Sequence, residues 1–251
     1  MNNKKVNHRH LYRLPWTLPD NAISWLEPTA MCNLSCDGCY RENQKNSHKT
    51  LEEIKHELDI FQDKRNTDCI SIAGGDPLLH PQILDIVGEI KKRGIKPILN
   101  TNGVALNSDF LKELKKAGVY GFTFHVDSKQ GRTREWRGKN EIELNQLRYH
   151  YARMVADAGG ISCSFNSTVY EDTLQYVPEL VKWAEDNIDI VHTVVFICFR
   201  HVVPAMPFDW YAGGKKVDWQ NILYHSDTDR KVDILSTDVL NKIREEFPEF
   251  T

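Results

Sequence analysis

Strand-like and helix-like stretches alternate along most of this chain, and this alternation restricts its fold more than any other feature. In the stretch 50–64, for example, Leu51, Ile54 and Leu58 recur at helical spacing. The six predicted strands are 23–28, 69–73, 96–100, 120–126, 161–169 and 191–199. The helices predicted between and after them are 50–64, 81–93, 108–117, 141–158, 173–187 and 237–247.

Strict alternation of this kind predicts parallel strands joined by right-handed helical crossovers. Two architectures satisfy it: an open doubly wound sheet, and a barrel or part-barrel. The length of 251 residues allows one large domain or two small ones. Because both architectures place functional residues at the carboxyl ends of strands, those ends are where chemistry is expected.

The composition excludes several other classes of protein. A chain that is 41% apolar and 27% charged is globular, so disorder and collagen-like structure are excluded. The net charge of −3 provides no general attraction to nucleic acid or to anionic membranes. No apolar run approaches the roughly 18–20 residues that span a bilayer. The basic first 16 residues have no apolar stretch like that of a secretory signal.

Three of the six cysteines crowd into eight residues, as Cys32, Cys36 and Cys39. Their C-x3-C-x2-C spacing lets one short loop place three thiolates around a single metal centre, and Gly38 eases the turn between the last two. Disulfide frameworks are typical of small secreted chains, so pairing of all six is not expected. The other three are predicted to be ordinary buried thiols: Cys69, Cys163 and Cys198.

Three nearby ligands are one fewer than a closed metal site requires. A structural zinc ion takes four protein ligands, and an electron-transfer [4Fe–4S] cluster takes four cysteines. Three thiolates on a four-iron cluster would leave one iron open to a substrate or cofactor. The alternatives are a zinc site completed by a distant histidine, for which His48 and His80 are the candidates, or three unrelated thiols.

The cysteine loop and four further motifs closely resemble the radical S-adenosylmethionine (SAM) superfamily. The loop follows the first predicted strand and is itself followed by an aromatic residue, Tyr40. The further motifs occur in the family's order, at or near the ends of the next four strands. They are GGDP at 74–77, NTNG at 100–103, HVDS at 125–128 and NSTV at 166–169. The resemblance covers residues 23–200.

This resemblance implies a partial (β/α)6 TIM-type barrel of parallel strands with helices outside, formed by residues 22–200. Residues 1–21 would form an N-terminal arm. Residues 201–251 would form an irregular segment and a helix, as a lid over the barrel mouth or as the first part of a truncated extension.

The resemblance also implies a chemistry. Cys32, Cys36 and Cys39 would hold a [4Fe–4S] cluster, and SAM would bind its open iron. An electron from a flavodoxin- or ferredoxin-like donor would cleave SAM to a 5′-deoxyadenosyl radical, which abstracts hydrogen from a substrate that the sequence does not identify. Because oxygen destroys such a cluster, the cytoplasm is the expected location. The alternatives are a zinc-dependent enzyme on the same framework and a non-catalytic iron–sulfur scaffold or electron carrier.

The resemblance assigns SAM contacts residue by residue. Tyr40 would lie near the adenine, the 74–76 turn would receive the amino group, and two polar residues would contact the ribose or carboxylate. Asp76 stands where the family usually has Glu, so its reach is one methylene shorter. The residues implied to bind SAM are Tyr40, Gly74, Gly75, Asp76, Ser128 and Asn166.

Two further features lie near the fourth strand. His125 is expected to be a hydrogen-bonded core residue, with substrate contact as the alternative. Asp127 could cap the segment that follows it. The arginine-rich run 132–137 is expected to be a solvated basic loop, with contact to a carboxylate or phosphate as the alternative.

Overall fold

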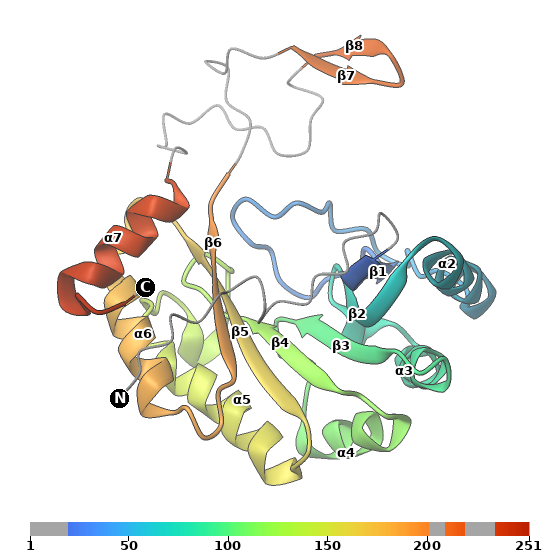
Figure 1. The fold of residues 1–251 in the computed structure, drawn as a ribbon, viewed down its shortest axis with the longest axis horizontal. Coiled ribbons are helices and arrows are strands. Elements are labelled where there is room, and N and C mark those ends of the chain that lie inside the picture. The colour runs from blue at the N-terminus through green and yellow to red at the C-terminus, as the bar shows by residue number, and fades with distance from the viewer. Residues whose placement is uncertain (1–19, 201–208, 219–233, 251) are drawn as a thin grey trace, which may run out of the picture.

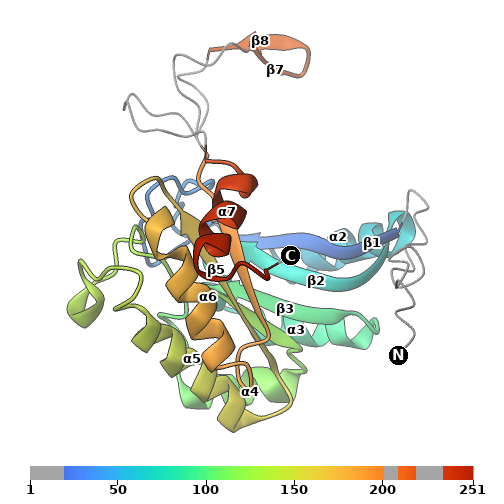
Figure 2. The same ribbon diagram turned by 60° about the vertical axis from the view of Figure 1, so that its left-hand side comes forward.

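Six parallel strands form one curved sheet in the order β1-β2-β3-β4-β5-β6 (Figures 1 and 2). This computed structural model describes residues 20–200, 209–218 and 234–250. The sheet is an open half-barrel, which confirms the predicted partial TIM-type barrel. The strands are β1 Asp20–Thr29, β2 Asn66–Gly74, β3 Lys96–Thr101, β4 Gly121–His125, β5 Ser162–Val169 and β6 Thr193–Cys198.

The helices that connect the strands cover the convex side of the sheet (Figure 1). They are α2 Leu51–Lys64, α3 Ile83–Lys92, α4 Ser108–Ala117, α5 Asn145–Ala158 and α6 Val177–Asp186, with the last helix, α7 Ser236–Glu246, packed on α6. The described part of the chain also contains three single turns of 3₁₀ helix, η1 Pro77–Leu79, η2 Arg134–Trp136 and η3 Leu174–Tyr176. No helix in the described ranges is both long and apolar enough to cross a membrane.

Local capping sets the ends of the best-predicted helices. The side chain of Asn107 accepts hydrogen bonds from the backbone N–H groups of Asp109 and Phe110 at the start of α4. Gly118 ends the same helix with a φ of 104°, a left-handed conformation that favours glycine. At the start of α2, Thr50 and Glu53 form a reciprocal capping box.

The hydrophobic core lies between the sheet and these helices. Phe122 and Phe124 of β4 and Phe165 of β5 are fully buried there, and the Phe124 ring stacks on Tyr151 of α5 at 4.7 Å between centroids. Successive side chains of a strand point to opposite faces of the sheet, so the residues next to core-facing positions face the concave side. Asn100 of β3 and Asn166 of β5 are such residues, which makes the middle of the concave face polar.

The structure departs from the predicted elements at several places. The helix predicted over 173–187 is α6 Val177–Asp186, because residues 174–176 form the 3₁₀ turn η3. The helix predicted from residue 141 begins at Asn145, because Glu141 belongs to the preceding turn. The C-terminal region 201–251, predicted to be irregular before its last helix, contains a hairpin of β7 Trp210–Ala212 and β8 Lys215–Val217. Its turn is Gly213-Gly214, with φ values of 56° and 76°, the pair of positive angles that a tight two-residue hairpin requires. Residues 1–19 of the predicted arm, and residues 201–208, 219–233 and 251 of the predicted C-terminal segment, lie outside the described residues.

Candidate cluster and cofactor site

The cysteine loop connects β1 to α2 and is tied to the ends of two other strands. The backbone N–H of Asp76, just after β2, donates to the Met31 carbonyl at 2.7 Å. The backbone N–H of Asp37 donates to the carbonyl of Lys129, beyond β4, at 2.8 Å. These contacts hold the loop, drawn in blue in Figure 1, at the carboxyl edge of the sheet.

Two glycines permit very close approaches in this region. A Cβ atom on Gly38 would lie 2.1 Å from Cε2 of Phe199, and the φ of Gly38 is +67°. A Cβ atom on Gly75 would lie 2.1 Å from the carbonyl oxygen of Met31. Both distances are far shorter than van der Waals contact, so a residue with a side chain at either position would clash with this arrangement of the loop.

The three thiols of the loop influence one another. Cys32 and Cys36 are half-buried, Cys39 is exposed, and all six cysteines of the chain are free. Burial, together with the charges of Asp127, Cys39 and Cys32, raises the pKa of Cys36 to about 12. Burial also raises the pKa of Cys32, with added contributions from Asp76 and Cys39. The charges of these thiols and of the neighbouring carboxylates Asp76 and Asp127 therefore act on one another, and a bound cation would compensate them.

This donor set fits an iron–sulfur cluster better than a zinc ion. Within the described ranges, no three His, Cys, Asp or Glu side chains converge closely enough to hold a single metal ion. Both ring nitrogens of His80 are engaged, Nδ1 with the Gln82 backbone N–H at 3.1 Å and Nε2 with the Lys49 carbonyl at 2.9 Å. The ring of His48 packs edge-on against His80. His80 is therefore occupied elsewhere and does not complete a zinc site.

The carboxylate of Asp76 is buried and joins the ends of β2 and β3. Its oxygens accept from the Thr101 hydroxyl at 2.9 and 2.8 Å, from the Asn102 backbone N–H at 2.9 Å and from the Leu78 backbone N–H at 3.0 Å. Burial raises the pKa of this carboxyl, and these hydrogen bonds oppose the shift. The shorter Asp side chain is thus committed to internal contacts, and the backbone of the turn is what faces the cysteine loop.

Asp76→Asn is expected to lower the free energy of unfolding by about 1–3 kcal/mol, because an amide NH2 would meet a donor where a carboxylate oxygen now accepts. Urea unfolding of the metal-free protein measures this. The exposed Asp109→Asn is the matched control and should change stability by less than about 0.5 kcal/mol. Unchanged stability together with weakened SAM binding would instead mean that the Asp76 carboxylate contacts SAM directly.

Glu27 of β1 organises the end of the cysteine loop. Its carboxylate accepts the Tyr40 hydroxyl at 2.8 Å and the Trp25 indole N–H at 3.0 Å, and it pairs with Arg41 at 3.2 Å. The Tyr40 hydroxyl also lies 3.4 Å from the Gly74 carbonyl. Sequence reasoning missed Glu27, although a lone acidic residue in an apolar strand is a signal that could have found it.

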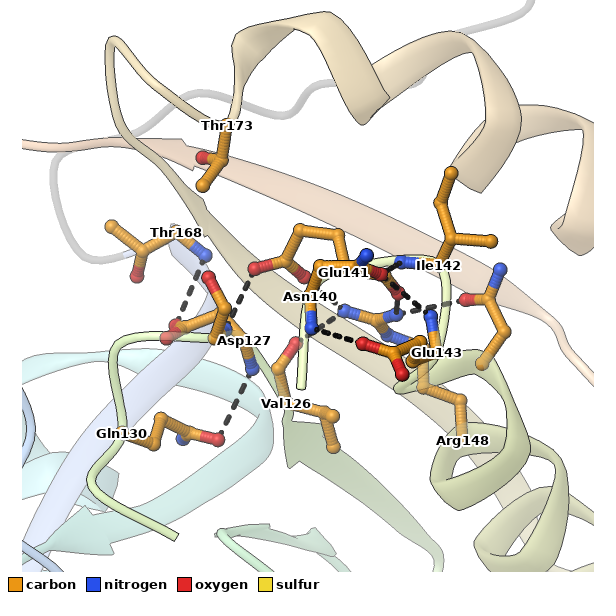
Figure 3. Close-up of polar contacts among 12 residues, drawn as sticks. Val126, Asp127, Gln130, Asn140, Glu141, Ile142, Glu143, Arg148, Thr168 and Thr173 are labelled. Carbon is orange, nitrogen blue, oxygen red and sulfur yellow. Dashed lines mark hydrogen bonds and ion pairs between the residues drawn. The ribbon is translucent and has the colours of Figure 1, made fainter. Parts of the chain in front are cut away.

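A buried ion pair braces the end of β4 (Figure 3). Glu141 and Arg148 are both almost inaccessible, and Arg148 Nη2 lies 2.6 Å from Glu141 Oε2 and 2.7 Å from the Val126 carbonyl. The other Glu141 oxygen accepts the Ser128 backbone N–H at 2.7 Å. The pair therefore holds both sides of the turn that carries Ser128. No sequence pattern revealed it, since Glu141 read as an ordinary residue of a helix.

His125 and Asp127 form a dyad next to this turn. His125 Nε2 lies 2.8 Å from Asp127 Oδ2 and 3.0 Å from the Thr168 hydroxyl, and the His125 side chain is 35% exposed. Burial favours a higher pKa for Asp127, but hydrogen bonding and charge from His125 outweigh it and hold the pKa below its usual range. Asp127 Oδ1 also accepts from the Lys129 backbone N–H, which confirms the capping role considered for it. His125 is thus hydrogen-bonded and still half-open to the concave face.

Arg132 departs from the expected solvated basic loop. It is 7% exposed, and its Nη2 donates to the backbone carbonyls of Asn102 at 2.8 Å and His125 at 3.0 Å. The prediction for the loop was wrong at this residue, because unsatisfied strand-end carbonyls recruit its guanidinium. Arg134 and Arg137 are exposed, as predicted.

Asn166, the last of the residues implied to contact SAM, lies within β5, and its side chain is on the concave face of the sheet. Its Nδ2 lies 3.5 Å from Asn100 Oδ1, and the Asn100 amide in turn donates to the Ser71 hydroxyl. Beside the β4 turn, a cavity of about 410 Å³ is lined in part by Asp127 and Ser128. The structure thus brings the predicted positions to one edge and one face of the sheet.

Residues 26–184 match the family described as the radical SAM superfamily, which is more than half of the chain. The chain belongs to this superfamily. Its members are enzymes that use a [4Fe–4S] cluster and SAM, and the three-cysteine loop described above fits that cluster.

Two curated relatives illustrate the similarity. The tungsten-containing aldehyde ferredoxin oxidoreductase cofactor-modifying protein of Pyrococcus furiosus is 32% identical over 109 residues, which are 41% of this chain and 30% of that protein. The AdoMet-dependent heme synthase of Nitratidesulfovibrio vulgaris is 26% identical over 181 residues, 68% of this chain and 48% of that protein. The aligned region thus spans less than half the length of either relative.

Among solved structures, the fold is similar to that of Streptococcus suis SuiB, with a TM-score of 0.61 and 17% identity. That match covers 92% of this chain and 47% of SuiB. At this identity the likeness concerns the fold alone.

Proposed function

We propose that this chain is the catalytic barrel of a radical SAM enzyme. The observation that carries the proposal is that the loop with the three cysteines is hydrogen-bonded to the ends of β2 and β4, at the carboxyl edge of the sheet. Cys32, Cys36 and Cys39 hold the cluster and leave one iron for SAM. When bound, cluster and cofactor supply a 5′-deoxyadenosyl radical that takes a hydrogen atom from the substrate.

The residues around the loop bind and orient SAM in this proposal. Backbone carbonyls of the 74–76 turn accept the amino group, while the Asp76 carboxylate positions that turn. Tyr40 lies on the adenine side, with its hydroxyl anchored on Glu27. Ser128 and Asn166 contact the ribose or the carboxylate. The Glu141–Arg148 pair keeps Ser128 in place.

The concave face would receive the substrate. Its centre presents hydrogen-bonding side chains, including His125, Asn100 and Asn166. These groups suit a polar substrate rather than a fully apolar one, because covering polar side chains with an apolar surface costs free energy. One named relative is a cofactor-modifying protein and the other a heme synthase, so their likeness does not select the compound.

An external reductant is required, and we propose a flavodoxin- or ferredoxin-like donor. The cysteine loop is not fully buried, and the exposed Cys39 provides a short route for the electron from the donor. Because oxygen destroys a cluster with an open iron, the cytoplasm is the proposed location.

Anaerobic reconstitution tests the proposal. About four irons and four sulfides per chain are expected, and dithionite reduction with SAM should release 5′-deoxyadenosine. Zinc uptake without iron would contradict it and favour the zinc enzyme. A cluster that never yields 5′-deoxyadenosine would favour an iron–sulfur scaffold or electron carrier.

A further inference from the structure

The side-chain amide of Asn102 points its NH2 group at the cysteine loop. Asn102 follows β3 and is 7% exposed. Its Nδ2 lies 3.7 Å from Cys32 Sγ and 2.7 Å from Asn33 Oδ1. Because an amide NH2 carries two hydrogens, one can serve each acceptor.

The orientation of this amide is determined by its other contacts. Asn102 Oδ1 accepts the backbone N–H of Val104 at 2.9 Å, so a flipped amide would place NH2 against that donor. The backbone N–H of Asn102 donates to Asp76, and its carbonyl accepts from Arg132. The residue is therefore held on three sides, and its NH2 group faces Cys32.

A hydrogen-bond donor that points at a ligand sulfur changes the reduction potential of the metal centre that the sulfur holds. Reduction adds negative charge to a cluster and to its thiolates, so an N–H···S hydrogen bond stabilises the reduced form more than the oxidised form. The bond acts more strongly where water is scarce, and Cys32 is half-buried.

We propose that Asn102 is a positioning residue that raises the reduction potential of the cluster by donating to Cys32. This inference rests on the proposed function, since it requires a cluster on the three cysteines. Asp76 holds the backbone of Asn102 at the end of β3, and the Asn102 amide in turn makes the cluster easier to reduce.

Asn102→Ala tests the inference on the reconstituted protein by a redox titration followed by electron paramagnetic resonance. The ratio of reduced to oxidised cluster at a fixed potential should fall roughly threefold, the size of a modest hydrogen bond. That fold-change corresponds to about 30 mV for a one-electron couple. Asn33→Ala is the matched control, because it removes the other acceptor of the same amide and keeps the donor to Cys32. Its potential should equal that of the wild type.

A second measurement covers the case in which Asn102→Ala does not fold. In the reduced wild-type protein, pulsed electron–nuclear spectroscopy should detect a cluster-coupled proton that exchanges in D2O and that carries the coupling of ¹⁵N-labelled Asn. Absence of that signal overturns the inference. The inference is also overturned if the cluster of Asn102→Ala has the same reduction potential as that of the wild-type protein. It is overturned as well if Asn33→Ala shifts the potential as much as Asn102→Ala does. A wild-type chain that takes up no iron overturns the proposed function and this inference together.

Discussion

Cys36→Ala should abolish cluster assembly and SAM cleavage together, reducing bound iron from about four atoms per chain to less than about one. Two thiolates cannot retain a four-iron cluster against competing thiols and water. His80 uses both ring nitrogens elsewhere, so it cannot replace the lost thiolate. Iron and sulfide analysis after anaerobic reconstitution gives the first readout, and 5′-deoxyadenosine release gives the second.

Cys163→Ala is the matched control for this substitution. Cys163 is fully buried in β5, and burial raises its pKa to about 12, so its thiol stays neutral and packed in the core. Its loss should leave iron content and SAM cleavage at wild-type levels and cost about 1 kcal/mol of stability. Full iron loading of Cys36→Ala, or loss of iron from Cys163→Ala, would contradict the assignment of the ligands.

Arg148→Met is expected to destabilise the fold by about 3–5 kcal/mol, because it leaves the Glu141 carboxylate buried without its partner. The guanidinium also donates to the carbonyls of Val126 and Glu141, and those acceptors lose their donors. Urea unfolding of the metal-free protein measures the loss. Because the turn at Ser128 depends on Glu141, SAM binding should weaken in whatever fraction remains folded.

Lys139→Met supplies the control for Arg148→Met, since Lys139 pairs with Glu143 near the same turn but both side chains are more than 40% exposed. This substitution should cost no more than about 0.5 kcal/mol. Adding Glu141→Gln to Arg148→Met should recover part of the lost stability, because it removes the buried charge. An Arg148→Met protein within about 1 kcal/mol of the wild type would show that the pair is not needed.

Much of the fold could be predicted because its signals are local. The periodicity of apolar residues predicted all six strands of the sheet. The bounds of α4 were predicted correctly, since Asn107 and Gly118 act on their own neighbours. The start of α5 was wrong by four residues, because Glu141 is held by a buried partner rather than by helical hydrogen bonds. The β7–β8 hairpin was missed although Gly213-Gly214 is a strong turn signal.

By itself, the sequence determined the alternating architecture, the family and the three-cysteine motif proposed to hold the cluster, because periodicity and ligand spacing are properties of short segments. Only the tertiary structure decided how the surrounding polar groups are used. Asp76 turns inward to Thr101, and the Asn102 amide reaches Cys32, a residue 70 positions earlier. Such choices follow from which buried donors and acceptors packing brings within about 3–4 Å, and that depends on the whole sheet.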